Sequence, residues 1–206
     1  MMKAKIAAIY NLILPNKRIN RFILILFIIG FISGAFFLTI IGTEEKELVT
    51  SQITNFISNI NNNTISNLDM LKSSIISNYI YIILLWILGL SIIGVIINIF
   101  FIYLKGFILG FSLSSIILTY KVKGLLFCLI YIFPNELVKI FVILLLGVYS
   151  LTLSIDIVRE LLKKKNSELR KVFKRYLSVL GISIILVGLS SLYEAYVIPN
   201  LLNLIY

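Results

Sequence analysis

The sequence predicts an all-α, polytopic integral membrane protein with about five transmembrane helices. Three observations support this class: 60% of the 206 residues are hydrophobic, only 14% are charged, and several uncharged stretches are long enough to cross a bilayer. An ordinary soluble domain has about 45–50% apolar and about 25% charged residues. A soluble domain of this size could not cover so much apolar surface, so we expect one membrane domain spanning residues 1–206.

The first two predicted spans are uncharged stretches. The hydrocarbon core of a bilayer, about 30 Å thick, requires about 20 apolar residues in a helix. Residues 22–42 and 79–104 contain no charged side chain, and we predict them as the first and second spans. The first is too long and too bulky at its end for a cleaved signal peptide.

The middle of the chain is more difficult to divide. Residues 105–121 can form a third span only if the lysines at its two ends, Lys105 and Lys121, extend their stems to the interfaces. Residues 124–133 are too short to cross, and we interpret them as a re-entrant or interfacial piece. The alternative is that they belong to one long, kinked helix.

Two further spans are predicted, at residues 135–157 and 177–194. Pro134 fits the first turn before the fourth span, where a missing N–H has no cost. The fifth span is followed by Pro199, which ends the regular helix, and by a short apolar tail that we expect at the interface.

The distribution of Lys and Arg predicts the orientation. Basic residues gather before the first span and in the loop 158–176, whereas the loop 43–78 contains two lysines and four acidic residues. Because cytoplasmic loops carry the excess of Lys and Arg, the N-terminus and the loop 158–176 are predicted to be cytoplasmic. The loop 43–78 and the C-terminus are then external.

The external loop 43–78 shows helical periodicity, with apolar residues on one face at steps of three and four. This face either folds onto the membrane surface or the chain's own helices, or it docks an external partner. We also place the segment that follows the fifth span on this external side. The candidates for partner binding are Ile53, Phe56, Ile57, Glu194, Tyr196 and Pro199.

Few charges fall inside the predicted spans. Glu136 lies in the first turn of the fourth span, where the helix dipole favours a carboxylate, and Lys139 is placed to pair with it. Glu194 requires either a basic group at the outer interface, such as Lys121 or Lys123, or a contact with a partner protein.

Glycines recur at spacings that let helix backbones approach closely. We interpret them as sites of helix packing inside the bundle, with binding of a partner helix as the alternative. The helix-packing candidates are Gly30, Gly34, Gly89, Gly94, Gly106 and Gly110.

The sequence shows no constellation for catalysis. It has no His, a single Cys and no phosphate-binding glycine motif. We therefore predict no enzymatic activity, no cofactor and no metal site. We expect contacts with membrane lipids, no nucleic acid and no small-molecule substrate.

A series of short motifs, in a fixed order along nearly the whole chain, resembles the stage II sporulation protein M family. The motifs are Trp86-Ile87-Leu88-Gly89, Leu104-Lys105-Gly106-Phe107, Phe133-Pro134 and Glu194-Ala195-Tyr196 with Pro199. Distant relatives outside spore-formers have His-Gly after this proline, where the present chain has Asn135-Glu136. This difference favours the sporulation branch of the family.

The resemblance implies a five-span protein of endospore-forming bacteria that acts when the mother cell engulfs the forespore. It implies a complex with stage II sporulation proteins D and P, which are a lytic transglycosylase and an amidase/endopeptidase that remodel septal peptidoglycan. The M member is then the non-enzymatic scaffold or anchor in the mother-cell engulfing and septal membrane.

The alternative function is a small membrane transporter or permease-like subunit that uses a broken helix at residues 124–133. The shortage of polar residues within the predicted spans and the lack of a detectable inverted repeat weigh against it.

Overall fold

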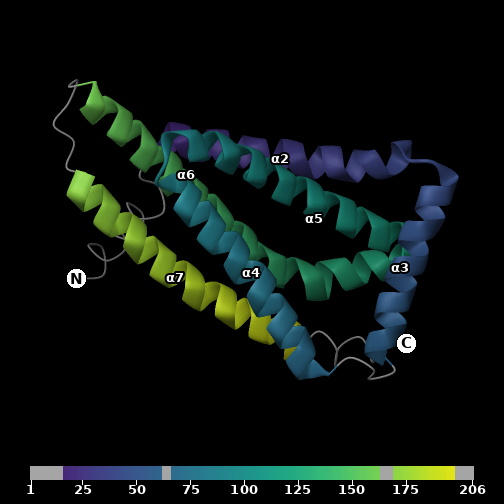
Figure 1. Cartoon of the computed structure of the whole chain (residues 1–206). Coiled ribbons are helices and arrows are strands. Elements are labelled where there is room, and N and C mark those ends of the chain that lie inside the picture. Colours follow the sequence, from purple (N-terminus) through teal and green to yellow (C-terminus); the bar gives the residue numbers. More distant parts are fainter. Residues whose placement is uncertain (1–15, 62–65, 163–168, 198–206) are drawn as a thin grey trace.

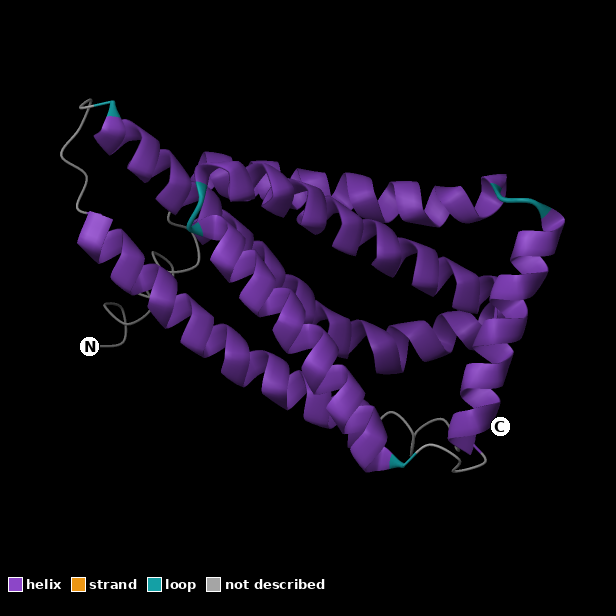
Figure 2. Ribbon diagram, in the orientation of Figure 1, coloured by secondary structure: helices purple, strands orange, loops and turns teal. Residues whose placement is uncertain are grey.

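The computed structural model describes residues 16–61, 66–162 and 169–197. Within these ranges the chain is helical and has no strand, which confirms the all-α class (Figures 1 and 2). The helices are α2 (Lys17–Ile40), α3 (Thr43–Asn61), α4 (Asn67–Gly89), α5 (Ile92–Phe127), the π-helical η1 (Cys128–Ile132), α6 (Phe133–Leu161) and α7 (Leu169–Tyr196).

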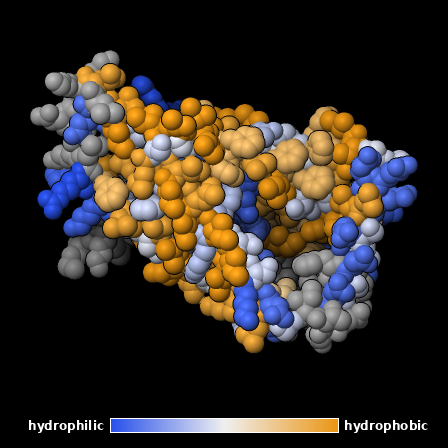
Figure 3. Space-filling view, in the orientation of Figure 1, coloured by the Kyte–Doolittle hydropathy of each residue, from blue (hydrophilic) through white to orange (hydrophobic). Residues whose placement is uncertain are grey.

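Five of the described helices, α2, α4, α5, α6 and α7, are long and apolar enough to cross a membrane, which confirms the predicted number of spans. They form a bundle, and α3 lies across one end of it (Figure 1). We call this end the α3 end, and we call the other the basic end because the first turns of α7, with Arg170 and Lys171, lie there. On the face shown in Figure 3, hydrophobic side chains cover most of the bundle, and many of the hydrophilic ones lie at its two ends.

The second and third spans divide at a different place from the predicted one. Helix α4 ends at Gly89, and α5 begins at Ile92 after a turn at Leu90 and Ser91. Residues 79–104 are therefore not one span, and the predicted boundary at residues 104–105 falls inside α5. The turn is tight, because a Cβ atom on Gly94 would collide with the carbonyl oxygen of Leu88. This turn contains no charged residue, so the hydrophobic stretch continues through it. A hydropathy profile therefore does not reveal the turn.

Residues 124–133 are not a separate re-entrant piece. The chain reverses at Lys121, which has a positive φ of 52°. The residues after it are helical and continue through η1 into α6, as in the kinked-helix alternative. Pro134 explains the π-helical turn, because proline cannot donate to the carbonyl four residues earlier and its ring crowds that carbonyl.

Glycines bring α2 and α5 into backbone contact, and these two helices share the most extensive packing. A Cβ atom on Gly30 or Gly34 would collide with the α5 backbone, and one on Gly106 or Gly110 would collide with the α2 backbone. Gly89 lies beneath the Tyr176 hydroxyl group. Together with Gly94 in the α4–α5 turn, all six glycines chosen from the sequence occupy close contacts.

The helix with the largest buried share is α6. On one side Val142, Leu146 and Tyr149 pack against α4 and α7, and on another Ile143 packs against Ile23 of α2 and other buried side chains. Since lipid is as apolar as these side chains, close packing rather than escape from water holds such helices together. Helix α6 therefore packs against each of the other four spans.

We predict that Gly34→Ala and Gly110→Ala each weaken the α2–α5 contact, by about 1–3 kcal/mol, because the added methyl group overpacks a backbone interface. The midpoint of thermal unfolding in detergent measures this. Gly181→Ala is the control, since no atom lies within 4 Å of its Cβ position. Equal midpoints for the three variants would contradict the packing role.

Candidate functional site

A cluster of charged and polar side chains lies where α4, α6 and α7 meet, toward the α3 end. Its centre is Lys139 of α6, which is 5% exposed. The Lys139 Nζ atom lies 2.9 Å from Glu136 Oε1 and 2.6 Å from Glu194 Oε2. One buried cation therefore bridges two carboxylates on two helices, and bonds between ionised groups are the stronger kind.

The positions of these three side chains follow from the helices that carry them. Glu136 and Lys139 stand three residues apart on α6, so they lie on one face and pair, which confirms the sequence prediction. Helix α7 runs antiparallel to α6 and brings Glu194 beside Lys139 (Figure 1). The predicted pairing of Glu194 with Lys121 or Lys123 is wrong, because Glu194 pairs with Lys139 and those two lysines lie exposed at the reversal within α5.

Neutral polar groups of α4 extend the cluster. Ser74 Oγ donates to Glu194 Oε2 at 2.8 Å, and Asn78 Nδ2 donates to Ser74 Oγ at 3.1 Å. Nearby, Ser190 Oγ of α7 donates to Asn135 Oδ1 of α6 at 2.6 Å. Burying a polar group without a partner is costly, so these bonds hold the three helices in one register.

A cavity of about 210 Å³ opens between α5 and α6 beside this cluster. Its polar lining comes from Lys105, Ser112 and Glu136. Its apolar lining consists of Ile108, Leu109, Leu113, Ile116 and Ile132. Charged groups thus gather inside the bundle, although the predicted spans contain few charged residues.

The sequence predicts Lys105 at the end of a span, but the structure places it elsewhere. It lies inside α5, with its Nζ atom 5.6 Å from the centre of the Tyr81 ring of α4. A cation over an aromatic face is stabilised by the ring quadrupole. Lys105 is therefore held inside the bundle, at the wall of the cavity.

The apolar face of α3 packs against the chain's own helices, which was the first of the two alternatives. Ile57 is 7% exposed and lies against Phe127, and Ile53 packs against the same cluster. The chain's own side chains therefore cover Ile57 and partly cover Ile53. A role of these two residues in partner binding stays a prediction. The side chain of Phe56 lies outside the described ones.

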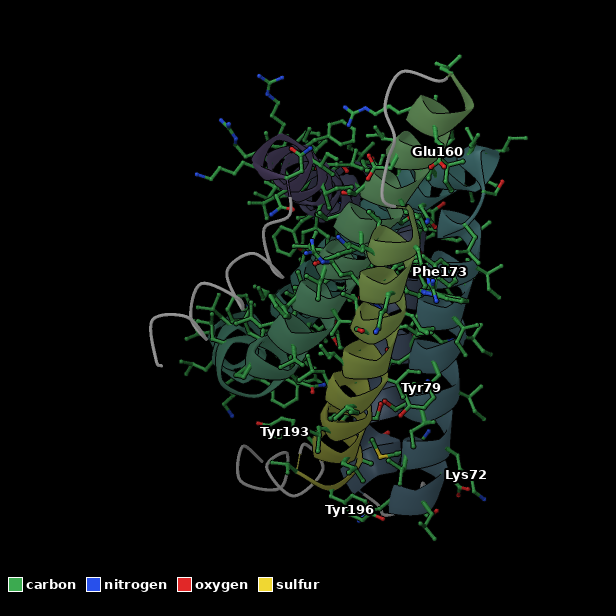
Figure 4. The ribbon with its side chains drawn as sticks, turned by 90° about the vertical axis from the view of Figure 1, so that its left-hand side faces the viewer. Lys72, Tyr79, Glu160, Phe173, Tyr193 and Tyr196 are labelled. Carbon is green, nitrogen blue, oxygen red and sulfur yellow. The ribbon has the colours of Figure 1, made fainter. Side chains whose placement is uncertain are left out.

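The remaining partner candidates lie near the end of α7. Glu194 belongs to the charged cluster, and Tyr196 is 40% exposed in the last helical turn. Figure 4 shows Tyr193 and Tyr196 at this end of α7, the end where Lys72 of α4 also lies. Pro199 lies outside the described residues.

Sequence reasoning missed the polar residues that α4 contributes. Ser74 and Asn78 stand four residues apart and so share one face of a predominantly apolar helix. That spacing was a signal for a buried polar contact. Its partner was not visible, because Ser74 and Glu194 are 120 residues apart in the chain.

Among the described residues, no group of three or more His, Cys, Asp or Glu side chains is placed to hold a metal ion. The charged groups that come together include equal numbers of positive and negative side chains. Lys105 and Lys139 face Glu136 and Glu194, so the cluster is balanced in charge.

Residues 23–199 match the family model described as stage II sporulation protein M. The chain belongs to the stage II sporulation protein M family. The matched residues include α3 to α7 entire and most of α2, so the family resemblance inferred from the sequence motifs is confirmed. No curated protein and no solved structure matches the chain.

We predict that Lys139→Met destabilises the protein by about 3–5 kcal/mol, because the substitution leaves two carboxylates without their cation. Partial exposure of Glu194 lowers the effect toward the smaller value. Adding Glu136→Gln and Glu194→Gln restores much of the loss. Unfolding midpoints in detergent measure these differences.

Lys72→Met is the matched control, since Lys72 carries the same charge on the exposed surface of α4. An equal effect of Lys72→Met and Lys139→Met would show that the cluster does not bear on stability.

Proposed function

We propose that this protein is a non-enzymatic membrane scaffold that anchors peptidoglycan-remodelling partners during engulfment of the forespore. The family and the multi-pass helical bundle support a sporulation-related membrane protein. The family resemblance suggests stage II sporulation proteins D and P as the partners.

The observation that carries the proposal is the placement of α3. Its inner face is held by Ile57 against Phe127, so the helix is fixed across the end of the bundle. Its outer face is polar and partly acidic. The exposed residues on it include Glu44, Glu47, Leu48, Ser51, Gln52 and Asn55. A surface ordered before binding loses less entropy when a partner docks, which suits an anchor.

The proposed orientation places α3 outside the cell. Lys and Arg gather at the basic end, as is typical of cytoplasmic segments, and α3 begins with Thr43-Glu44-Glu45. The polar face of α3 then points toward the peptidoglycan, in the mother-cell membrane during engulfment. The partners, rather than this chain, would cleave the cell wall, and the carboxylates of Glu136 and Glu194 serve to pair Lys139.

We predict that the double variant Glu47→Lys/Leu48→Ser lowers co-purification with stage II sporulation protein P several-fold. Leu48 is 64% exposed on the outer face of α3, so its replacement leaves the bundle core intact. Capture from detergent-solubilised membranes, normalised to the amount of bait, measures the effect.

Leu162→Ser is the matched control, since Leu162 is 59% exposed at the basic end. Undiminished capture by the double variant would remove the outer face of α3 as the docking surface. Ile53 and Ile57 do not serve for this test, because both pack in the cluster that holds α3 against the bundle, and their replacement would also disturb that contact.

A second candidate function is a permease-like subunit. The observation that favours it is the cavity between α5 and α6, which is lined by Lys105 and Glu136. The π-helical turn η1 lies directly before α6. Ionisable groups within a membrane bundle are frequent in transport pathways.

Solute flux in proteoliposomes separates the two functions. The scaffold predicts that radiolabelled amino acids and phosphate cross at the rate of protein-free liposomes. A permease predicts a faster flux that Lys105→Met abolishes, because the cavity loses its cation. Faster flux with that sensitivity would overturn the scaffold proposal.

A further inference from the structure

A second groove lies at the basic end of the bundle, away from the charged cluster. It has a volume of about 370 Å³, and its lining residues are Leu90, Leu153, Ile157, Arg170 and Phe173. They come from the α4–α5 turn, from α6 and from α7.

The walls of this groove are apolar. Leu153 and Ile157 stand four residues apart on one face of α6, and Phe173 lies opposite on α7. Figure 4 shows Phe173 on the side of α7 that faces α4. Phe173 is 44% exposed, so the protein leaves a large aromatic side chain incompletely packed in the groove.

The rim of the groove is cationic. Arg170 belongs to the lining, and Lys171, Lys174 and Arg175 follow within the next turns of α7. The acidic side chains on the facing end of α6 are Asp156 and Glu160, and Asp156 lies 3.6 Å from Arg159. Arg170 and Lys174, four residues apart on one face of α7, give the rim its positive charge, and the positive end of the α7 dipole adds to the field.

An apolar groove with a cationic rim, at the end of a membrane bundle, fits an amphiphile with an anionic head. Basic pockets between transmembrane helices are typical sites for anionic lipid head groups. A zwitterionic lipid would bring an ammonium group close to the same cations. The charge of the rim therefore selects the anionic lipid.

We propose that this groove binds one anionic phospholipid, with its phosphate at Arg170 and an acyl chain against Leu153, Ile157 and Phe173. The lipid fills the space between the ends of α6 and α7. The proposal concerns the basic end alone and does not depend on a scaffold function at α3. In the proposed orientation, the lipid belongs to the cytoplasmic leaflet.

The only tryptophan of the sequence is placed to report on this groove. Trp86 precedes Leu90 by one turn of α4 and stacks on Tyr176 of α7, with ring centres 5.7 Å apart. Bromine atoms on an acyl chain quench tryptophan fluorescence at short range. A brominated lipid seated in the groove should therefore quench Trp86.

The experiment uses the full chain in nanodiscs that contain phosphatidylglycerol or phosphatidylcholine with the same brominated chains. Half-maximal quenching is expected at a several-fold lower mole fraction of phosphatidylglycerol. Arg170→Gln should abolish most of this preference. Arg18→Gln, an exposed arginine in the first turn of α2, is the control and should retain it.

A second variant tests the apolar wall without changing the charge. Ile157→Phe narrows the groove and should reduce quenching by both lipids, with the emission of Trp86 in lipid without bromine showing that the fold is intact. Native mass spectrometry provides an independent measure. The wild-type chain should retain one phosphatidylglycerol molecule, and Arg170→Gln should retain none.

Equal quenching by the two lipids would overturn the proposal, and so would identical behaviour of Arg170→Gln and Arg18→Gln. Failure of the wild-type chain to retain phosphatidylglycerol in the mass spectrometer would also overturn it.

Discussion

Lys139 is the group on which the arrangement of three helices depends. Its ammonium group is buried, and it contacts carboxylates that stand 58 residues apart on α6 and α7. Removing a charged group from water costs more free energy than a single ion pair at the surface would gain. The bundle must therefore supply several partners at once. Ser74 and Asn78 of α4 complete the set. The register of α4, α6 and α7 therefore follows from satisfying one cation.

A different interaction holds α2 and α5 together. Two helices in lipid gain little from hiding apolar side chains, so they must gain from contact itself. Gly30, Gly34, Gly106 and Gly110 remove side chains where the two backbones meet, and the neighbouring atoms then approach closely. The bundle thus combines the charged cluster of α4, α6 and α7 with close backbone packing of α2 and α5. Helix α6 belongs to the cluster and also packs against α2 and α5.

The two ends of the bundle have different chemistry and, in our proposals, different partners. At the α3 end a helix lies across the bundle with a polar outer face, held by apolar contacts to Phe127 and its neighbours. At the basic end the helices part around an apolar groove with a cationic rim. A protein that anchors others benefits from both, since one end faces the partners and the other holds the bilayer.

The sequence by itself determined the helical class, the number of spans, the family and the Glu136–Lys139 pair, because each depends on composition, order or spacing along one helix. The tertiary structure alone decided the turn at Leu90 and Ser91, the position of Lys105 inside α5 and the partner of Glu194. It also decided that Ile53 and Ile57 face inward. The physical reason is that uncharged turns leave no mark in hydropathy, and that contacts between distant helices depend on how the helices pack.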